Sequence, residues 1–376
     1  MDGRPFSNIA KRTARAFCVA LCARSALKLL KRLPSRPLLR LSVSDLLDGR
    51  PTTDDCRFPL FLSFYSASYQ IIDKLLHFCR RTRDGCNAIV AASLAGPSII
   101  LLDSSDGHTI VLFALARSLE ALFNTSIKRG YLKQLPFGTL ILFSVCHCIV
   151  CCAVLRKPNL LPKSYYKALL KYSECFDDNI ASVMFRQSTY VPCERILHKG
   201  MSCWQHITYT AIRIFAQFVK FYSVLYGVGV IMQPKILRKP VSTFKTLARN
   251  VLNSALFFSV DASVFMGLVC VLRKAVGTAP LPVSVAVISS TLASFALLIE
   301  RPSRRLELTM FMVHHTLHII HSWLNDLRLI RQAGSSLKRL TKVLVFCLSM
   351  MPIMHAYERE RSCNSSLMNG VLSFVV

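Results

Sequence analysis

The fold is decided by a stretch that reads SLAGPSIILL over Ser93–Leu102, DSSDGH over Asp103–His108 and TIVLFALARSLEALF over Thr109–Phe123. Two apolar segments thus flank a short polar corner. The apolar segments carry the composition of buried helices, and the corner carries the polar residues and glycine that end helices and start turns. We expect a helical hairpin here.

The same hairpin occurs a second time. It reads TLASFALLI over Thr291–Ile299, ERPSRR over Glu300–Arg305 and LELTMFMVHHTLHII over Leu306–Ile320. A shift of 198 positions aligns the two copies without a gap, so that Leu94 corresponds to Leu292 and Leu119 to Leu317. Internal repetition at this scale indicates a duplicated structural unit. The sequence therefore predicts an all-α protein with two homologous helical-bundle repeats.

The hydrophobicity of the chain indicates that these bundles lie in a membrane. Hydrophobic residues make up 52% of the 376 residues, and the mean hydropathy is +0.41. The run Leu135–Leu155 contains no acidic or basic residue apart from one histidine and is about as long as a helix that crosses a bilayer. Further candidate spans lie near 57–79, 88–102, 108–124, 209–232, 250–272, 280–299, 306–324 and 340–356. We therefore expect a polytopic integral membrane protein.

The net charge of +27 could indicate binding to nucleic acid, but its placement favours a membrane. Basic residues gather where apolar runs stop, for example at 80–83, 128–133, 156–171 and 301–305. This arrangement is typical of residues that flank membrane spans and meet anionic lipid headgroups. We expect the lipid bilayer as the partner and no nucleic acid. If successive spans cross the membrane in alternate directions, basic loops lie on both of its sides. The positions of the basic residues therefore do not predict the orientation of the protein in the membrane.

The order of apolar and polar segments gives five parts. Residues 1–55 form a basic amphipathic segment and a loop, 56–172 the first transmembrane bundle, 173–202 a polar linker with cysteine and histidine, 203–360 the second bundle and 361–376 a C-terminal tail. Residues 1–40 contain ten Lys or Arg and one acid. Such a segment is either a helix in the membrane interface, which we favour, or an organelle transit peptide.

Small residues predict where helices touch. Ala92 and Gly96 stand four apart, and Ser290 and Ser294 occupy the corresponding positions 198 residues later. Helices in lipid approach closely through such small-xxx-small pairs. Both pairs are expected to form helix-contact faces.

Three ionisable residues lie inside apolar runs, where a charge is costly unless it is paired or hydrated. Arg117 and Glu120 are three apart and share one helical face, so they form either an ion pair or a polar lining. Asp261 has no partner evident in the sequence. A lone buried aspartate favours a hydrated cavity.

Histidines and cysteines suggest metal chemistry only weakly. His314, His318 and His321 share one helical face, with His315 beside them, but no glutamate stands between them as in metalloproteases. Many of the fifteen cysteines lie within apolar runs, and we expect Cys146, Cys148, Cys151 and Cys152 to pack as small apolar side chains. Cys193, His198 and Cys203 are too few for a closed metal site without ligands from elsewhere in the chain. We expect no metal, no cofactor and no catalytic residue.

The sequence resembles the transmembrane protein 135 family. The resemblance lies in NAIVAASLAG (Asn87–Gly96), RSLEALF (Arg117–Phe123), LPKSY (Leu161–Tyr165), LIERPSRR (Leu298–Arg305) and the segment from Cys193 to Cys203. It covers about Phe58–Ser173 and Cys193–Glu360 in the family's order. Departures are Ala92, where family members tend to have glycine, and the histidines of 314–321, which are not part of the family pattern. The corner residues that match the family motif are Glu300, Arg301, Ser303, Arg304 and Arg305.

The family is distantly similar to helical membrane proteins of mitochondrial import and to a peroxisomal membrane protein. The resemblance implies a non-enzymatic multi-pass protein, first of the peroxisomal and alternatively of the mitochondrial membrane. It further implies a role in mitochondrial fission, organelle dynamics and peroxisome-linked lipid homeostasis, with organelle-division or lipid-handling proteins as partners. Two alternatives remain open. The bundles could enclose a conduit for a lipid, solute or protein, or the histidine face could serve a membrane-bound metal enzyme.

Overall fold

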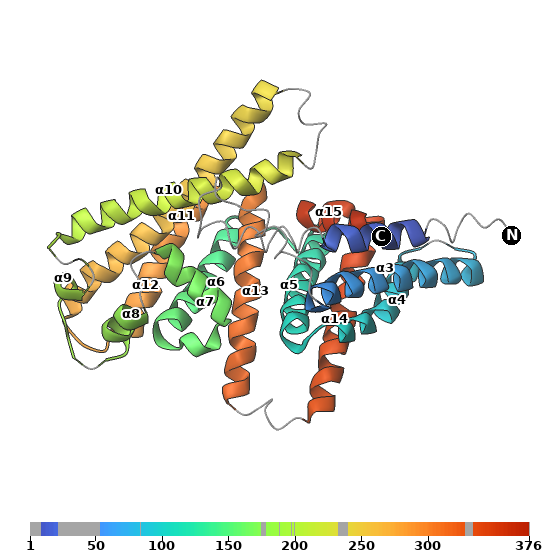
Figure 1. The fold of residues 1–376 in the computed structure, drawn as a ribbon, viewed down its shortest axis with the longest axis horizontal. Helices are drawn as coiled ribbons and strands as arrows, with labels where there is room; N and C mark the ends of the chain where they lie inside the picture. Colours follow the sequence, from blue (N-terminus) through green and yellow to red (C-terminus); the bar gives the residue numbers. More distant parts are fainter. Residues whose placement is uncertain are drawn as a thin grey trace. The chain divides into compact units, whose positions relative to one another are not determined.

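The computed structural model is helical throughout the part of the chain that it describes, which is residues 9–21, 53–82, 84–173, 178–187, 189–196, 198, 200–231, 240–327 and 334–375. The predicted all-α class is confirmed for these residues. The chain divides into two compact units: unit 1 combines residues 1–134 with 332–376, and unit 2 is the continuous stretch 135–331 (Figure 1).

Unit 1 is built around the last long helix of the chain. Helix α14 packs against α4, α5 and the short 3₁₀ segment η3. The core contains Phe61, Tyr65, Ile99, Phe346 and Met354, all almost completely buried. The elements of unit 1 are α3 (Thr53–Arg80), α4 (Gly85–Ala95), η3 (Gly96–Leu101), α5 (Ser104–Lys128), α14 (Ser335–Arg359), η7 (Arg361–Cys363) and α15 (Ser366–Val375).

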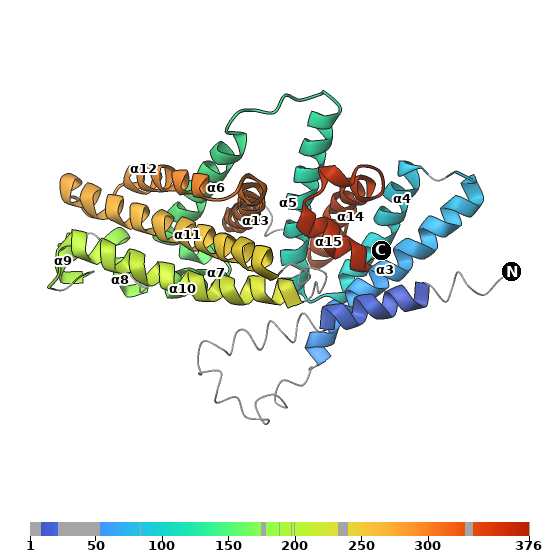
Figure 2. The same ribbon diagram turned by 90° about the horizontal axis from the view of Figure 1, so that it is seen from above.

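Unit 2 places α6 against α12, α13 and η6, and it packs α10 against α11 (Figures 1 and 2). Its core includes Phe143, Val150, Phe257, Leu297 and Ile319. The elements are α6 (Gly138–Arg156), η4 (Pro158–Leu160), α7 (Lys163–Ser173), α8 (Asp178–Phe185), α9 (Cys193–Ile196), α10 (Cys203–Ile231), α11 (Pro240–Val276), α12 (Val283–Ala293), η6 (Ser294–Ile299) and α13 (Pro302–Asp326).

Both predicted helix–corner–helix segments are present, with shorter corners than expected, but both helices of each segment pack on a third helix, which is α14 in unit 1 and α6 in unit 2. In each unit an 11-residue α-helix continues into a six-residue 3₁₀ segment and is followed by a 25-residue α-helix. The helical conformation is interrupted for two residues in each copy, Leu102 and Asp103 before α5 and Glu300 and Arg301 before α13. Most corner residues therefore form a first helical turn. Pro302 favours this because its fixed φ and missing N–H suit the first helical position.

Four of the described helices are long and apolar enough to cross a membrane: Ser104–Lys128, Gly138–Arg156, Val241–Val276 and Ser336–Arg359. The candidate spans near 88–102 and 280–299 are not continuous α-helices of that length, because each changes to 3₁₀ geometry after 11 residues. Such 17-residue segments are marginal for a hydrocarbon core of about 30 Å. The chain is a multi-pass helical membrane protein.

The compact units divide the chain differently from the segments 56–172 and 203–360. Helix α6 follows the first hairpin in sequence but belongs to unit 2, and α14 follows the second hairpin but belongs to unit 1. Apolar periodicity shows which side of a helix is buried but not which other helix packs against it. For this reason the prediction from the sequence grouped consecutive helices into the same bundle.

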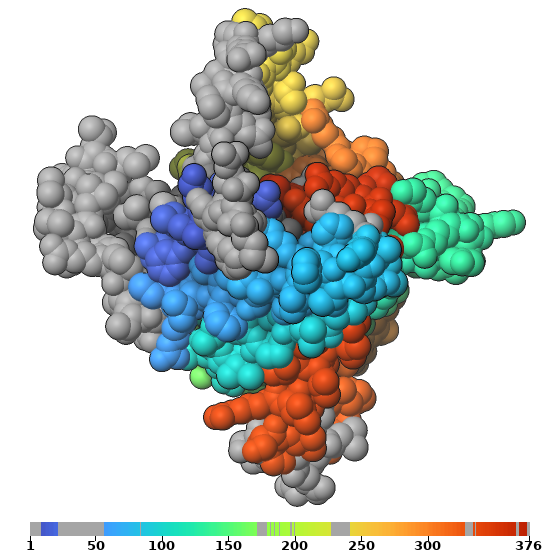
Figure 3. All heavy atoms as spheres, turned by 90° about the vertical axis from the view of Figure 1, so that its right-hand side faces the viewer, coloured from blue at the N-terminus to red at the C-terminus, as the bar shows by residue number. Residues whose placement is uncertain are grey.

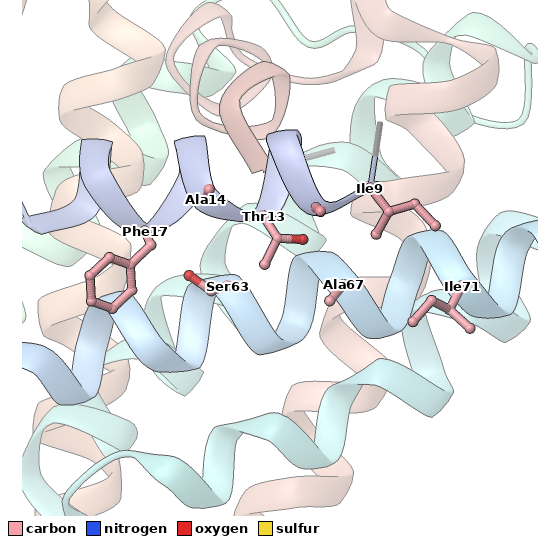
Figure 4. Close-up of a pocket in the computed structure, with 8 residues that line it drawn as sticks. Ile9, Thr13, Ala14, Phe17, Ser63, Ala67 and Ile71 are labelled. Atoms are coloured by element: carbon pink, nitrogen blue, oxygen red, sulfur yellow. The ribbon is translucent and has the colours of Figure 1, made fainter. Parts of the chain in front are cut away.

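The basic N-terminal segment forms a helix over residues 9–21 that lies along α3 (Figures 2 and 3). Ala16 and Ala20 are buried, whereas Lys11, Arg12 and Arg15 are exposed. An open apolar groove runs between the two helices and is lined by Ile9, Ala10, Thr13, Ala14, Phe17, Ser63, Ala67 and Ile71 (Figure 4). Of the loop predicted over residues 45–55, residues 45–52 lie outside the described residues, whereas residues 53–55 form the start of α3 and not a loop.

Ion pairs join the ends of two long helices in unit 1. Arg129 Nη2 lies 2.9 Å from Glu360 Oε1, and Lys128 Nζ lies 3.4 Å from Glu360 Oε2. The hydrogen bond from Arg129 lowers the pKa of Glu360 below its ordinary value. These basic residues follow the last apolar turn of α5, where side chains that meet lipid headgroups are expected.

Candidate functional site

A cluster of polar side chains lies between the apolar helices of unit 2. His147 on α6 places Nε2 3.6 Å from Asp261 Oδ2 on α11, and its Nδ1 lies 3.2 Å from Ser294 Oγ of η6. Phe143 and Phe265 lie beside the imidazole, with ring centroids 5.5 and 6.5 Å away. No partner for Asp261 is evident in the sequence, and the structure places His147 beside it.

The contacts of this cluster orient the imidazole of His147. At 3.6 Å the His147–Asp261 contact is too long for a direct hydrogen bond. Ser294 is fully buried and its hydroxyl donates to the carbonyl of Ser290, 2.7 Å away, so the hydroxyl oxygen can accept from Nδ1–H of His147. The second nitrogen of His147 then faces the carboxyl group. Titratable side chains in such a setting are candidates for a functional site.

The polar residues of unit 1 form a closed ion pair instead. Arg117 Nη1 lies 2.7 Å from Glu120 Oε2, and both side chains are buried. The same guanidinium donates to Ser365 Oγ at 3.3 Å and lies over the ring of Phe113. The pair therefore ties α5 to the chain just before α15. Of the two interpretations of Arg117 and Glu120, the ion pair is the one present.

The histidine face of α13 is engaged by neighbouring side chains. His315 stacks on Tyr165 of α7 with a centroid distance of 3.5 Å. His318 Nδ1 lies 3.3 Å from Ser322 Oγ, and His321 Nδ1 lies 3.3 Å from the side-chain amide nitrogen of Asn325. His314 is buried beside His315. These contacts support packing of α13 and do not bring the histidines together as metal ligands.

The corner that matches the family motif acts as a helix cap and anchor. Arg305 Nε donates to the carbonyl of Glu300 at 2.8 Å and its Nη2 to that of Leu298 at 2.7 Å, so it satisfies carbonyl groups at the end of η6. Arg304 Nη1 donates to Ser254 Oγ of α11 at 2.8 Å. Its guanidinium also lies over the rings of Tyr222 and Tyr226 of α10.

The remaining corner residues have lesser roles. Glu300 is buried, and its Oε2 accepts a hydrogen bond from the backbone N–H of Arg301 at 3.3 Å. Ser303 is exposed in the first turn of α13. Arg301 precedes α13 and is half-buried. Among the corner residues, Arg304 is the one whose side chain links α13 to α10 and α11.

Both predicted helix-contact pairs are buried. Ala92, Ser290 and Ser294 have no exposed surface. Gly96 touches α14 so closely that a Cβ added there would lie 2.3 Å from Cys347 Sγ and 3.1 Å from its Cα. In unit 1 only glycine fits between η3 and α14 at this point.

The segment from Cys193 to Cys203 lies against the end of α11. Cys193 is the first residue of α9 and Cys203 the first of α10, and their sulfur atoms are 3.7 Å apart. His198 lies between them in sequence and is buried. Cys270 of α11 completes the group: its sulfur lies within 4.8 Å of the ligand atoms of Cys193 and His198.

Sequence reasoning missed His147 and Cys270 as members of these sites. His147 stands 114 positions before Asp261, and Cys270 stands 67 positions after Cys203. Each lies in an apolar run among residues of similar composition. No local pattern marks either one, because the contact depends on which helices pack together.

These features define the class: a multi-pass helical membrane protein with polar side chains held between its apolar helices. Residues 192–321 match the family model described as the N-terminal cysteine-rich region of Transmembrane protein 135. This match places residues 192–321 in the transmembrane protein 135 family. No solved structure matches the chain.

Proposed function

We propose that this protein is a non-enzymatic component of the peroxisomal membrane, or alternatively of the mitochondrial membrane, that regulates organelle dynamics and peroxisome-linked lipid homeostasis. The observation that carries the proposal is the match of residues 192–321 to the transmembrane protein 135 family, together with four helices that are long and apolar enough to cross a bilayer. The partners would be organelle-division or lipid-handling proteins.

The packing supports a structural rather than a catalytic role. The most hydrophilic buried side chains of unit 1, Arg117 and Glu120, bind each other. In unit 2 the motif arginines Arg304 and Arg305 bind backbone and side-chain groups of neighbouring helices. Charged groups used in this way fix the arrangement of helices, which suits a protein that presents a surface to partners.

The proposal predicts a specific cellular location and phenotype. A fluorescently tagged chain is expected to coincide with a peroxisomal membrane marker, with a mitochondrial marker as the second expectation. Removal of the protein is expected to change mean mitochondrial length, and re-expression should restore it. A tagged Arg304→Leu variant, which loses the anchor of α13, is the control for a requirement for the folded chain. Location in the plasma membrane, or unchanged mitochondria and lipids, would contradict the proposal.

We also propose that the two hairpins and the helices after them arose by duplication. After α6 and after α14 the chain makes the same three-residue 3₁₀ turn, 203 positions apart. The residues before these turns, Lys157 and Glu360, have φ/ψ of −137°/67° and −139°/56°. The residues after them, Leu161 and Asn364, have −93°/150° and −89°/150°. Each duplicated unit would then contribute its last long helix to the other compact unit.

A second candidate function is a conduit through unit 2. The observation that favours it is the contact of His147 with Asp261 between α6 and α11, both of which are long and apolar enough to span a membrane. Ionisable residues at such positions mark pathways for ions or protons in other membrane proteins. Arg117 and Glu120 do not contribute, because they close on each other in unit 1.

The conduit predicts a flux that depends on the Asp261 carboxyl group. Purified protein in vesicles with a pH gradient is expected to carry protons, measured with an enclosed pH-sensitive dye. Asp261→Asn is expected to lower the rate at least tenfold, because the amide cannot exchange a proton with His147. Asp326→Asn, at an exposed position at the end of α13, should leave the rate unchanged. If the wild-type protein carries no more protons than empty vesicles, the conduit is contradicted.

A further inference from the structure

Three buried side chains in unit 2 bring their possible metal-ligating atoms together, and the sulfur of a fourth residue, Cys203, lies beside one of them. One coordinating atom each from Cys193, His198 and Cys270 lies within 4.8 Å of the other two, and all three residues are buried. The sulfur of Cys203 lies 3.7 Å from that of Cys193. With Zn–S bonds of about 2.3 Å and tetrahedral angles, two thiolates on one zinc ion lie about 3.8 Å apart. The cysteine pair already has this separation.

His198 is oriented as a metal-ligating histidine. Its ring is 1% exposed, and Nδ1 lies 2.7 Å from the backbone carbonyl of Met201. Nδ1–H therefore donates to this carbonyl, which leaves the lone pair of the neutral ring on Nε2. Nε2 is buried and has no hydrogen-bond partner among the residues described by the structure. A buried nitrogen without a partner costs free energy unless something binds it.

A buried cation beside the cluster also has no anionic partner among the residues that the structure describes. Arg273 stands one turn after Cys270 on α11 and is 2% exposed. Its Nη2 donates to the carbonyl of Val191 at 2.7 Å, and its guanidinium lies over the ring of Tyr190. It forms no ion pair with any described residue. Its other nitrogens, Nε and Nη1, are buried without a hydrogen-bond partner among those residues.

We infer that Cys193, His198, Cys203 and Cys270 bind one Zn²⁺ ion, with three thiolates and one imidazole as ligands. On binding, each thiol releases its proton to the solvent, and His198 binds as the neutral base through Nε2. Zn²⁺ with three thiolates carries one net negative charge. Arg273 supplies the compensating positive charge and holds the chain before Cys193 on α11 through Val191.

The position of the cluster explains what the ion would do. Cys270 lies in the last two turns of α11, and the basic residues Arg273 and Lys274 follow it. Trp204, the second residue of α10, is 76% exposed, as expected for an aromatic side chain at a membrane–water interface. The ion would join the start of α10 to the end of α11 at this interface. The site is structural, because all four coordination positions come from the protein.

The extent of the cysteine-rich region agrees with this assignment. Residues 192–321, which match the family model, contain three cysteines, and all three belong to the cluster. The expectation of no metal site depended on counting only Cys193, His198 and Cys203. Cys270 is the fourth ligand, and its position beside the other three could not be predicted from the sequence.

The test is the metal content of the full chain, purified in detergent under reducing conditions without chelators. Inductively coupled plasma mass spectrometry is expected to find one zinc per chain. The zinc content should fall to background in each of the variants Cys193→Ser, His198→Gln and Cys270→Ser, because the three remaining ligands bind zinc weakly. Cys347→Ser, which removes a buried cysteine of unit 1, is the matched control and should retain one zinc. His206→Gln tests a histidine whose ring centroid is 5.2 Å from that of His198 and should also retain it.

A second measurement uses the wild-type protein and does not depend on the folding of variants. Exchange of the bound metal for Co²⁺ is expected to give the visible absorption and the near-ultraviolet thiolate charge-transfer band of a tetrahedral cobalt–thiolate site. The inference is overturned if neither zinc nor cobalt binds stoichiometrically under reducing conditions. It is also overturned if peptide mapping finds a Cys193–Cys203 disulfide in place of the metal, or if zinc survives Cys270→Ser or is lost in His206→Gln.

Discussion

Glu120→Leu is expected to lower the free energy of unfolding by about 3–5 kcal/mol, since removing one member of a buried ion pair leaves the other charge uncompensated. Arg117 is 5% exposed, and its remaining contacts would be with Ser365 and the ring of Phe113. Neither Ser365 nor Phe113 carries a negative charge that could compensate the guanidinium group. The loss can be measured by equilibrium unfolding in mixed detergent micelles, followed by circular dichroism.

The double variant Arg117→Leu/Glu120→Leu is the matched control for Glu120→Leu. Both charges are then absent, and apolar side chains of similar length fill the space, so stability should return to within about 1 kcal/mol of the wild type. Asp84→Asn provides an exposed comparison. Arg80 lies 2.9 Å from Asp84 and lowers the pKa of its carboxyl group, but both side chains are largely in solvent. The Asp84→Asn variant should therefore have nearly the same free energy of unfolding as the wild type near neutral pH. Equal losses in Glu120→Leu and Asp84→Asn would contradict the buried ion pair.

Gly96→Leu is expected to destabilise unit 1 by about 3 kcal/mol or more, at the upper end of the range for overpacked cores. The added Cβ would meet both the sulfur and the backbone of Cys347. The sulfur can rotate away, but the Cα at 3.1 Å can move only if α14 shifts. Such a shift would open the contact of α14 with η3.

The control for Gly96→Leu is Gly370→Leu, in the exposed face of α15, where an added Cβ meets no atom within 4 Å. This variant should unfold like the wild type, or slightly later because leucine favours helix over glycine. Thermal unfolding of both variants in the same detergent gives the comparison. If Gly96→Leu and Gly370→Leu unfold at the same temperature, the close contact between η3 and α14 at Gly96 is contradicted.

The local structure of the hairpins could be predicted because it depends on neighbouring residues. The apolar runs around Asp103 and Glu300 specify helices, and polar residues together with Pro302 set where α5 and α13 begin. The 3₁₀ geometry of η3 and η6 was not predicted. Pro97 lies at the start of η3, but η6 contains no proline, so composition alone does not determine it.

The contacts between distant helices could not be predicted from the sequence. The membership of α14 in unit 1 and of α6 in unit 2 depends on complementary side-chain shapes, such as Gly96 against Cys347. The same limit applies to the sites. Asp261 and Cys193 were recognised as unusual residues, but His147 and Cys270 lie on other helices, where many residues of similar character stand nearby.

The distribution of α6 and α14 between the units has a consequence for biosynthesis. When the ribosome has made residues 1–334, the helices α3, α4 and α5 still lack α14, which covers their apolar faces in the finished protein. Unit 2 needs only residues 135–331, so all of its segments are available earlier. In the nascent chain, the apolar faces of α3, α4 and α5 therefore stay open to aggregation until α14 has been synthesised and has entered the bilayer. Any nonsense mutation upstream of Ser335 should leave the first part of the molecule without its closing helix, however much of unit 2 has been made.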